Sequence, residues 1–113
     1  MVAQPSLSLL TATLALLVTA TAAQAEDTIL RLSIKDHRFI PERLEVPAGT
    51  KVVLVIRNED AEPEEFDSAS LRREKIVFPG VETRLVLGRM EPGEYTFVGE
   101  YHEATAKGVI VAK

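Results

Sequence analysis

Apolar and polar side chains alternate along much of the chain after residue 27, as is typical of strands buried on one face. Leu or Ile fills every even position in residues 29–35, and the alternation returns in residues 83–87. Residues 51–58 are rich in Val and Ile and end at turn-forming residues, which predicts a central strand. The pattern therefore indicates β-structure from one end of this region to the other.

Further strands are predicted at residues 44–46, 75–78, 94–99 and 108–112, whereas residues 36–41 break the alternation and 64–70 are extended or irregular. One helical turn is expected near residues 70–74. About seven short strands at spacings of roughly 8 to 12 residues predict a sandwich or barrel. The side chains expected in its core are Phe39, Leu54, Ile56, Phe66, Phe78, Leu85, Tyr95, Phe97 and Val109.

The first 25 residues contain no Asp, Glu, Lys or Arg and end in Ala23-Gln24-Ala25. An apolar run followed by a small-x-small sequence is typical of a secretory signal peptide. We therefore expect a signal peptide over residues 1–25 and a single mature domain over 26–113, secreted or periplasmic and without a membrane span. A retained anchor is the alternative, but the Thr-rich run is marginal for a span of roughly 20 apolar residues.

Composition excludes several classes of function. The chain of 113 residues has no Cys, so it has no thiolate ligand and no Cys nucleophile. Its formal charge of −4 argues against nucleic acid as a partner. It contains no phosphate-binding glycine loop, nucleophile elbow or His-Glu-x-x-His motif. A two-carboxylate glycosidase is disfavoured because the domain is too small for a sugar cleft. No self-sufficient catalytic motif is therefore recognised in the sequence.

Four segments, in their order and spacing, together resemble one known family of Greek-key β-sandwiches. Residues 39–49 (FIPERLEVPAG) resemble the opening strands and their P-A-G turn, and 53–58 (VLVIRN) resembles the strand before the first copper ligand. Residues 92–97 (PGEYTF) and 108–111 (GVIV) resemble the last two strands. This resemblance, to the cupredoxins, covers nearly all of the expected mature domain and implies the all-β cupredoxin-like fold.

The blue-copper ligands of that family are largely replaced. Compared with a plastocyanin-like chain, Glu64 stands at the first His position and Gly99 at the Cys position, whereas His102 matches the second His. Ala106 or Lys107 stands where the axial Met is expected. A type 1 blue copper centre requires a thiolate and two imidazoles, so this chain cannot form one.

Within the cupredoxins, the chain is most similar to the periplasmic cupredoxin-like components of bacterial high-affinity iron permease systems. The segments that carry this similarity are residues 36–39 (DHRF), 63–68 (PEEFDS) and 99–103 (GEYHE). The resemblance implies a role in ferrous iron uptake, either delivering iron to a membrane permease or oxidising it for that permease. The partner that the resemblance implies is this membrane permease or another periplasmic component of the iron uptake system.

The candidate metal ligands are the two His residues and the acids around them: His37, Glu65, Asp67, Glu100, His102 and Glu103. Carboxylates and imidazoles suit divalent iron, manganese, zinc or copper, and we expect iron or copper. In a cupredoxin sandwich, the loop after Asn58 and the loop around His102 meet at one end, which His37 can also approach.

Other interpretations of these residues stay open. His37 could be an idle loop residue, and the acids could form only a solvated loop. Met90 is a candidate soft ligand, although packing is the commoner role of Met. By alternation, Glu64 shares the inward side of Phe66, and its role is less clear. The alternative function is a metal-free β-sandwich interaction module of the cell envelope.

Overall fold

The computed structural model describes residues 1–6, 8–20 and 26–113, and the predicted cleavage site Ala23-Gln24-Ala25 lies outside these described residues. Within the described ranges, none of the helical structure is long and apolar enough to cross a membrane. The elements are β1 (Thr28–Lys35), β2 (Arg38–Ile40), β3 (Arg43–Val46), β4 (Lys51–Asn58), β5 (Glu64–Ser68), β6 (Arg73–Val77), β7 (Glu82–Arg89), β8 (Gly93–Gly99), the 3-10 helix η1 (Glu100–His102) and β9 (Lys107–Ala112).

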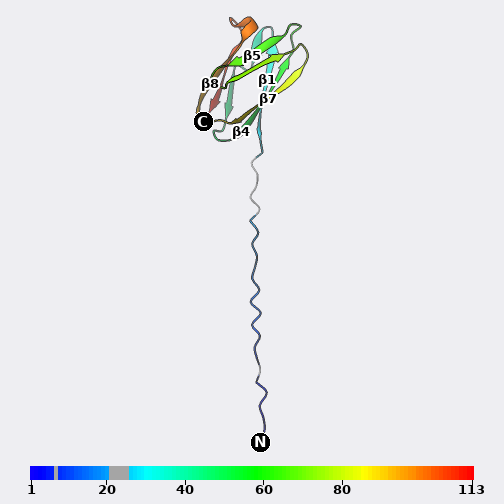
Figure 1. Cartoon of the computed structure of the whole chain (residues 1–113), viewed down its shortest axis with the longest axis vertical. Helices are drawn as coiled ribbons and strands as arrows, with labels where there is room; N and C mark the ends of the chain where they lie inside the picture. The colour runs from blue at the N-terminus through cyan, green and yellow to red at the C-terminus, as the bar shows by residue number, and fades with distance from the viewer. Residues whose placement is uncertain (7, 21–25) are drawn as a thin grey trace.

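The strands form two layers of a sandwich (Figure 1). One sheet has four strands in the order β2-β1-β4-β7, and the other has five in the order β3-β9-β8-β5-β6. The pairs β1–β4 and β3–β9 are parallel, and the other pairs are antiparallel. The predicted all-β sandwich is confirmed, with β4 inside its sheet and β3 at an edge, as the sequence indicated.

The described part of the chain has nine strands instead of about seven, because residues 64–68 form the regular strand β5 and residues 36–40 turn back into β2 instead of only breaking the pattern. Asp36 and His37 have φ angles of 51° and 56°, and they connect β1 to β2 as a two-residue turn. Two positive φ angles match the twist that joins antiparallel strands, and Asp and His are among the residues that tolerate this region. The turn therefore fixes His37 at the tip of the hairpin.

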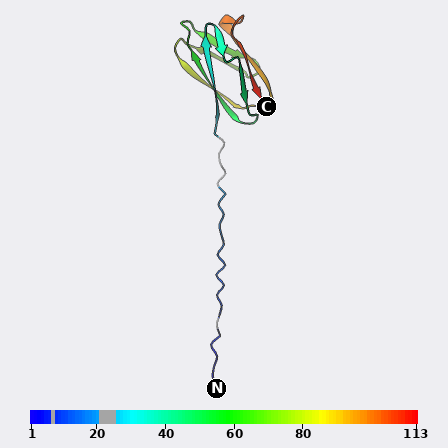
Figure 2. The same cartoon turned by 180° about the vertical axis from the view of Figure 1, so that it is seen from behind.

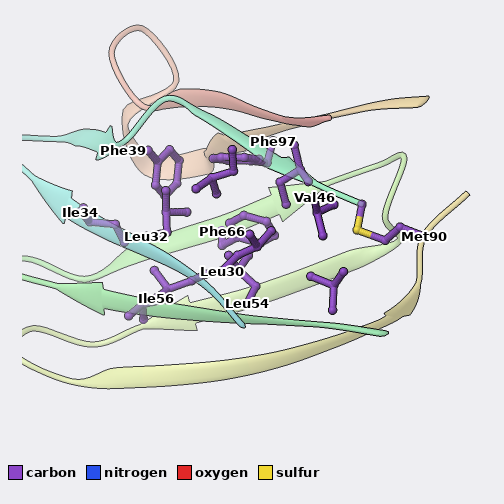
Figure 3. Close-up of a cluster of buried hydrophobic side chains, with 14 of the residues drawn as sticks. Leu30, Leu32, Ile34, Phe39, Val46, Leu54, Ile56, Phe66, Met90 and Phe97 are labelled. Atoms are coloured by element: carbon purple, nitrogen blue, oxygen red, sulfur yellow. The ribbon is translucent and has the colours of Figure 1, made fainter. Parts of the chain in front are cut away.

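The core lies between the two sheets and is centred on Phe39, Phe66 and Phe97 (Figure 3). The ring of Phe97 lies 5.0 Å from that of Phe39, nearly perpendicular to it, and 5.1 Å from that of Phe66. Leu54 and Ile56 are buried as predicted. Leu85 and Tyr95 are partly buried against the core, and Val109 is half-buried.

Two predictions about residues 69–78 are wrong. Phe78 is 59% exposed, because the edge strand β6 ends at the inward-facing Val77 and Phe78 begins the following loop. The expected helical turn near 70–74 is instead a reverse turn over residues 69–72 followed directly by β6. The side chain of Ser68 stabilises that turn, since its Oγ accepts a hydrogen bond from the Leu71 amide. Among the described residues, the one helical element is η1.

Three connections meet at one end of the sandwich. They are the β1–β2 turn, the β4–β5 loop and the β8–β9 connection that contains η1. The hairpin of β1 and β2 and the loop around η1 lie at the same end in both views (Figures 1 and 2). The amide of Glu59 in the β4–β5 loop donates to the carbonyl of Ile34 in β1 at 2.8 Å. Side chains from all three connections can therefore reach a common point.

Candidate metal centre

The two His side chains of the chain lie against each other. Their rings are stacked, with centroids 3.6 Å apart and planes inclined by 11°. His37 is at the tip of the β1–β2 hairpin, and His102 is the last residue of η1. The side chain of His102 is 22% exposed and that of His37 is 42% exposed. Two imidazoles from distant parts of the sequence thus share one partly open site.

The carboxylate of Glu62 completes a three-residue cluster. Its Oε2 lies 3.3 Å from Nε2 of His37 and 3.4 Å from Nε2 of His102, and the donor atoms of the three residues lie within 4.8 Å of one another. Two ligands each about 2.0–2.1 Å from one tetrahedrally coordinated ion are about 3.4 Å apart. Two imidazoles and one carboxylate therefore fit a divalent cation in chemistry and in donor spacing, and the stacked rings must tilt for both Nε2 lone pairs to point at one ion.

A fourth residue, Glu64, orients one of the imidazoles. Its side chain is 2% exposed, and its Oε2 lies 2.6 Å from Nδ1 of His102. Its Oε1 accepts hydrogen bonds from the amides of Tyr101 at 2.9 Å and Glu65 at 3.0 Å. A carboxylate at Nδ1 keeps the proton of a neutral imidazole there and leaves the lone pair of Nε2 free to coordinate a cation. This is the arrangement by which carboxylates support metal-binding His residues.

The same hydrogen bond alters the acid–base behaviour of His102. The contact with Glu64 raises the pKa of His102 above its ordinary value, against the opposing effect of burial. Glu62 adds a smaller effect in the same direction. Protons therefore compete for this imidazole at a higher pH than they would for a free His.

Gly99 leaves the space that the Glu64 carboxylate occupies. A Cβ atom at position 99 would lie 2.6 Å from Cδ of Glu64 and 2.7 Å from Cβ of Ala106. The φ and ψ angles of Gly99 are −89° and 108°, so its backbone conformation is open to any residue. Glycine is required here because the Glu64 carboxylate fills the space that a side chain would occupy.

Replacing Gly99 with Ala is expected to lower the free energy of unfolding by about 1–3 kcal/mol, the usual cost of overpacking a core. Chemical denaturation of the purified protein measures this. Part of the steric overlap is with the Glu64 side chain, so the losses in free energy of unfolding caused by Glu64→Ala and Gly99→Ala should not add. The double variant should be more stable than the sum of the two losses predicts. Strict additivity would contradict the assignment of this space to Glu64.

The structure separates the other predicted ligands from the two His residues. Glu65 and Glu100 form a second cluster with Glu74, also with donor atoms within 4.8 Å. Asp67 alternates with Phe66 as Glu65 does, so the two acids point to the same side, as predicted, and that side is the outer one. The Glu65 carboxylate raises the pKa of Glu100. These acids therefore lie on the outer face of the five-stranded sheet.

The remaining candidates lie elsewhere. Glu103 is exposed at the C-terminal cap of η1. Met90 is buried in the core cluster (Figure 3), in agreement with a packing role. Lys107 is exposed at the start of β9.

Sequence reasoning did not identify Glu62 and Glu64 as members of the site. Glu64 could have been found, because the alternation already placed its side chain on the same inward face of the strand as Phe66. A buried carboxylate requires hydrogen-bond partners, and the nearby His102 is an obvious one. Glu62 lies in a loop without periodicity, so no pattern predicts the direction of its side chain.

Comparison with known proteins agrees with this fold. Over 90 residues, the chain is 43% identical to an uncharacterized protein of Rickettsia prowazekii (strain Madrid E), covering 78% of this chain and 72% of that protein. The structure of this chain is similar to that of auracyanin A, a "blue" copper protein from Chloroflexus aurantiacus, with 13% identity and a TM-score of 0.66. The match covers 78% of this chain and 100% of that chain. The structure is also similar to that of a purple cupredoxin from Nitrosopumilus maritimus (18% identity, TM-score 0.57, 74% and 98%).

The two structural similarities establish the fold, and the family is established by the sequence. The model of the cupredoxin-like domain matches residues 8–112, which is nearly the whole chain. The absence of Cys means that the protein has no blue copper site. The chain belongs to the cupredoxin-like domain family.

Proposed function

We propose that this protein binds a divalent cation, iron or copper, through Nε2 of His37, Nε2 of His102 and a carboxylate oxygen of Glu62. The observation that supports this most is the convergence of three donor atoms from three separate connections, with Glu62 within 3.4 Å of both imidazoles. A metal-free sandwich has no evident need to hold two imidazoles and a carboxylate together at its surface.

The donor set favours some metals over others. A bound cation would supply the Lewis acidity or redox chemistry of the site, while the chain would supply two nitrogen ligands and one oxygen ligand. Such a set suits Fe²⁺, Mn²⁺, Zn²⁺ and Cu²⁺ better than Cu⁺, which prefers sulfur. Cupredoxins as a family are copper proteins, and this chain keeps one imidazole at a position that resembles one of their ligands.

We further propose that the cation-binding protein works outside the cytoplasm in ferrous iron uptake. The signal-like residues 1–25 support export. The resemblance to periplasmic components of iron permease systems supports iron as the cargo and a membrane permease, or a periplasmic component beside it, as the partner. The protein would either deliver Fe²⁺ to that permease or assist its oxidation.

The competing function is a metal-free interaction module. Exposed apolar side chains near one end of the sandwich, including Phe78 at 59% exposure and Val81 at 44%, are the observation that favours it. Under this alternative, the His pair and Glu62 would be a structural ion-pair cluster.

Calorimetric titration with anaerobic Fe²⁺, and separately with Cu²⁺, Mn²⁺ and Zn²⁺, distinguishes the two functions. We expect one cation to bind per chain. Glu62→Gln should weaken binding about 10-fold or more, since it removes the anionic ligand. Glu59→Gln removes an equal charge from the same loop and should leave affinity within about twofold.

Two results would count against the proposal. An absence of heat and of any thermal shift with all four cations would favour the metal-free module. A strong effect of Glu65→Gln together with no effect of Glu62→Gln would move the site to the outer cluster of Glu65, Glu74 and Glu100.

A further inference from the structure

We infer that Asp60 is a positioning residue that holds His37 against His102 before any cation binds. This inference rests on the proposed function, because positioning matters for binding only if His37 is a ligand. Asp60 lies in the β4–β5 loop, two residues before Glu62. Its carboxylate faces the backbone of the β1–β2 turn, which carries His37.

The contact is a two-pronged clamp. Oδ1 of Asp60 accepts a hydrogen bond from the Asp36 amide at 2.7 Å, and Oδ2 accepts one from the His37 amide at 3.0 Å. Both donors belong to residues in the left-handed region, with φ angles of 51° and 56°. Non-glycine residues adopt this region at an energetic cost that the surroundings must offset. The two charge-assisted bonds provide that compensation.

A second contact fixes the other backbone polar group of the same residue, His37. Oγ1 of Thr105, in the β8–β9 connection, donates to the carbonyl of His37 at 2.5 Å. The amide and the carbonyl of His37 are therefore both held from outside the hairpin. Because Thr105 lies three residues after His102, this bond also ties together the two segments that carry the stacked rings.

The buried side-chain amide of Asn58 holds the backbone of both Asp60 and Glu62. Asn58 is fully buried, and its Oδ1 accepts a hydrogen bond from the Asp60 amide at 2.9 Å. Its Nδ2 donates to the carbonyl of Glu62 at 2.8 Å and to that of Val77 at 2.9 Å. One side chain therefore sets both the residue that positions His37 and the carboxylate that joins the cluster. Such support reduces the ordering that a ligand must otherwise impose.

The test compares Asp60→Asn with Glu59→Gln, which removes the same charge from the neighbouring, exposed residue. An Asn side chain has one acceptor oxygen instead of two, so one clamp bond is lost. We expect Cu²⁺ affinity to fall about 10- to 100-fold in Asp60→Asn, the usual effect of losing a residue that supports a ligand. Glu59→Gln should stay within about twofold of the wild type.

The spectroscopic readout is independent of affinity. In cation-free protein, NMR should show the ring-current shift that the stacked His102 ring gives the protons of His37, and Asp60→Asn should reduce it. The Cu²⁺ electron paramagnetic resonance spectrum should change from two nitrogen ligands to one. Thr105→Val removes the opposite contact and should act in the same direction, which keeps the test available if Asp60→Asn folds poorly.

Two outcomes would overturn the inference. One is an Asp60→Asn protein with wild-type ring shifts and wild-type affinity. The other is an equal loss of affinity in Asp60→Asn and Glu59→Gln, which would mean that charge alone matters. If the wild type binds no cation while Asp60→Asn still loses the ring-current shift, the proposed function fails and the positioning role stands.

Discussion

Replacing Phe97 with Ala is expected to lower the free energy of unfolding by about 3–5 kcal/mol. The side chain of Phe97 is 2% exposed and packs between the rings of Phe39 and Phe66. Phe39 belongs to one sheet and Phe66 to the other, so the cavity would open where the two layers meet. The loss is a large part of the roughly 5–15 kcal/mol that holds a typical domain folded.

Urea denaturation followed by circular dichroism measures this effect. Val86→Ala is the matched control, since Val86 is 67% exposed on β7, and such surface substitutions stay within about 0.5 kcal/mol. Equal midpoints for Phe97→Ala and the wild type would contradict the packing described for the core.

Replacing His102 with Ala is expected to have the largest effect on cation binding. The substitution removes one of two nitrogen ligands and also leaves the buried Glu64 carboxylate without its partner. We expect the affinity for Cu²⁺ or Fe²⁺ to fall more than 100-fold, beyond the 10- to 100-fold typical of a supporting residue. The loss of cation affinity in Glu64→Gln should be only about 10- to 100-fold, because the amide still occupies the space beside the imidazole.

The pH dependence provides a second measurement on the same variants. His102 must be neutral at Nε2 to bind a cation, and its hydrogen bond to Glu64 raises the pKa of His102. Cation affinity should therefore decline on acidification, beginning above the ordinary His pKa of about 6.5. In cation-free protein the sign is opposite: protonated His102 contributes stability at low pH, and this contribution disappears as pH rises through the raised pKa.

Titrations at several pH values check these expectations. Glu64→Gln should move the decline in affinity to lower pH, because the anionic partner of the imidazole is gone. Wild-type affinity in His102→Ala at every pH, or an unshifted profile in Glu64→Gln, would show that His102 is not a ligand of the kind described.

The fold could be predicted from the sequence because the strands are regular. The alternation in residues 28–35 appears in the structure as a strand with buried Leu30, Leu32 and Ile34. Errors arose where alternation ends or where a turn has unusual angles. The exposure of Phe78 depends on where the edge strand β6 stops, and the hairpin at residues 36–37 depends on two left-handed residues.

The candidate site was only partly predictable. The resemblance pointed to His102, and the meeting of loops pointed to His37, so the structure's pairing of the two rings agrees with what the sequence suggested. The choice of acids could not be made in the same way. A period of two places Glu65 and Asp67 together but does not show that their face is the outer one. Glu62 depends on loop hydrogen bonds through Asn58, which no sequence pattern encodes.

Anomalous diffraction from crystals soaked anaerobically with Fe²⁺, recorded at the iron absorption edge, tests the central proposal most directly. A cation-binding cluster predicts one strong peak between Nε2 of His37, Nε2 of His102 and the carboxylate of Glu62. It also predicts that Nδ1 of His102 stays hydrogen-bonded to Glu64. A peak at the cluster of Glu65, Glu74 and Glu100 with none at the His pair would contradict the proposal, as would the absence of any ordered iron.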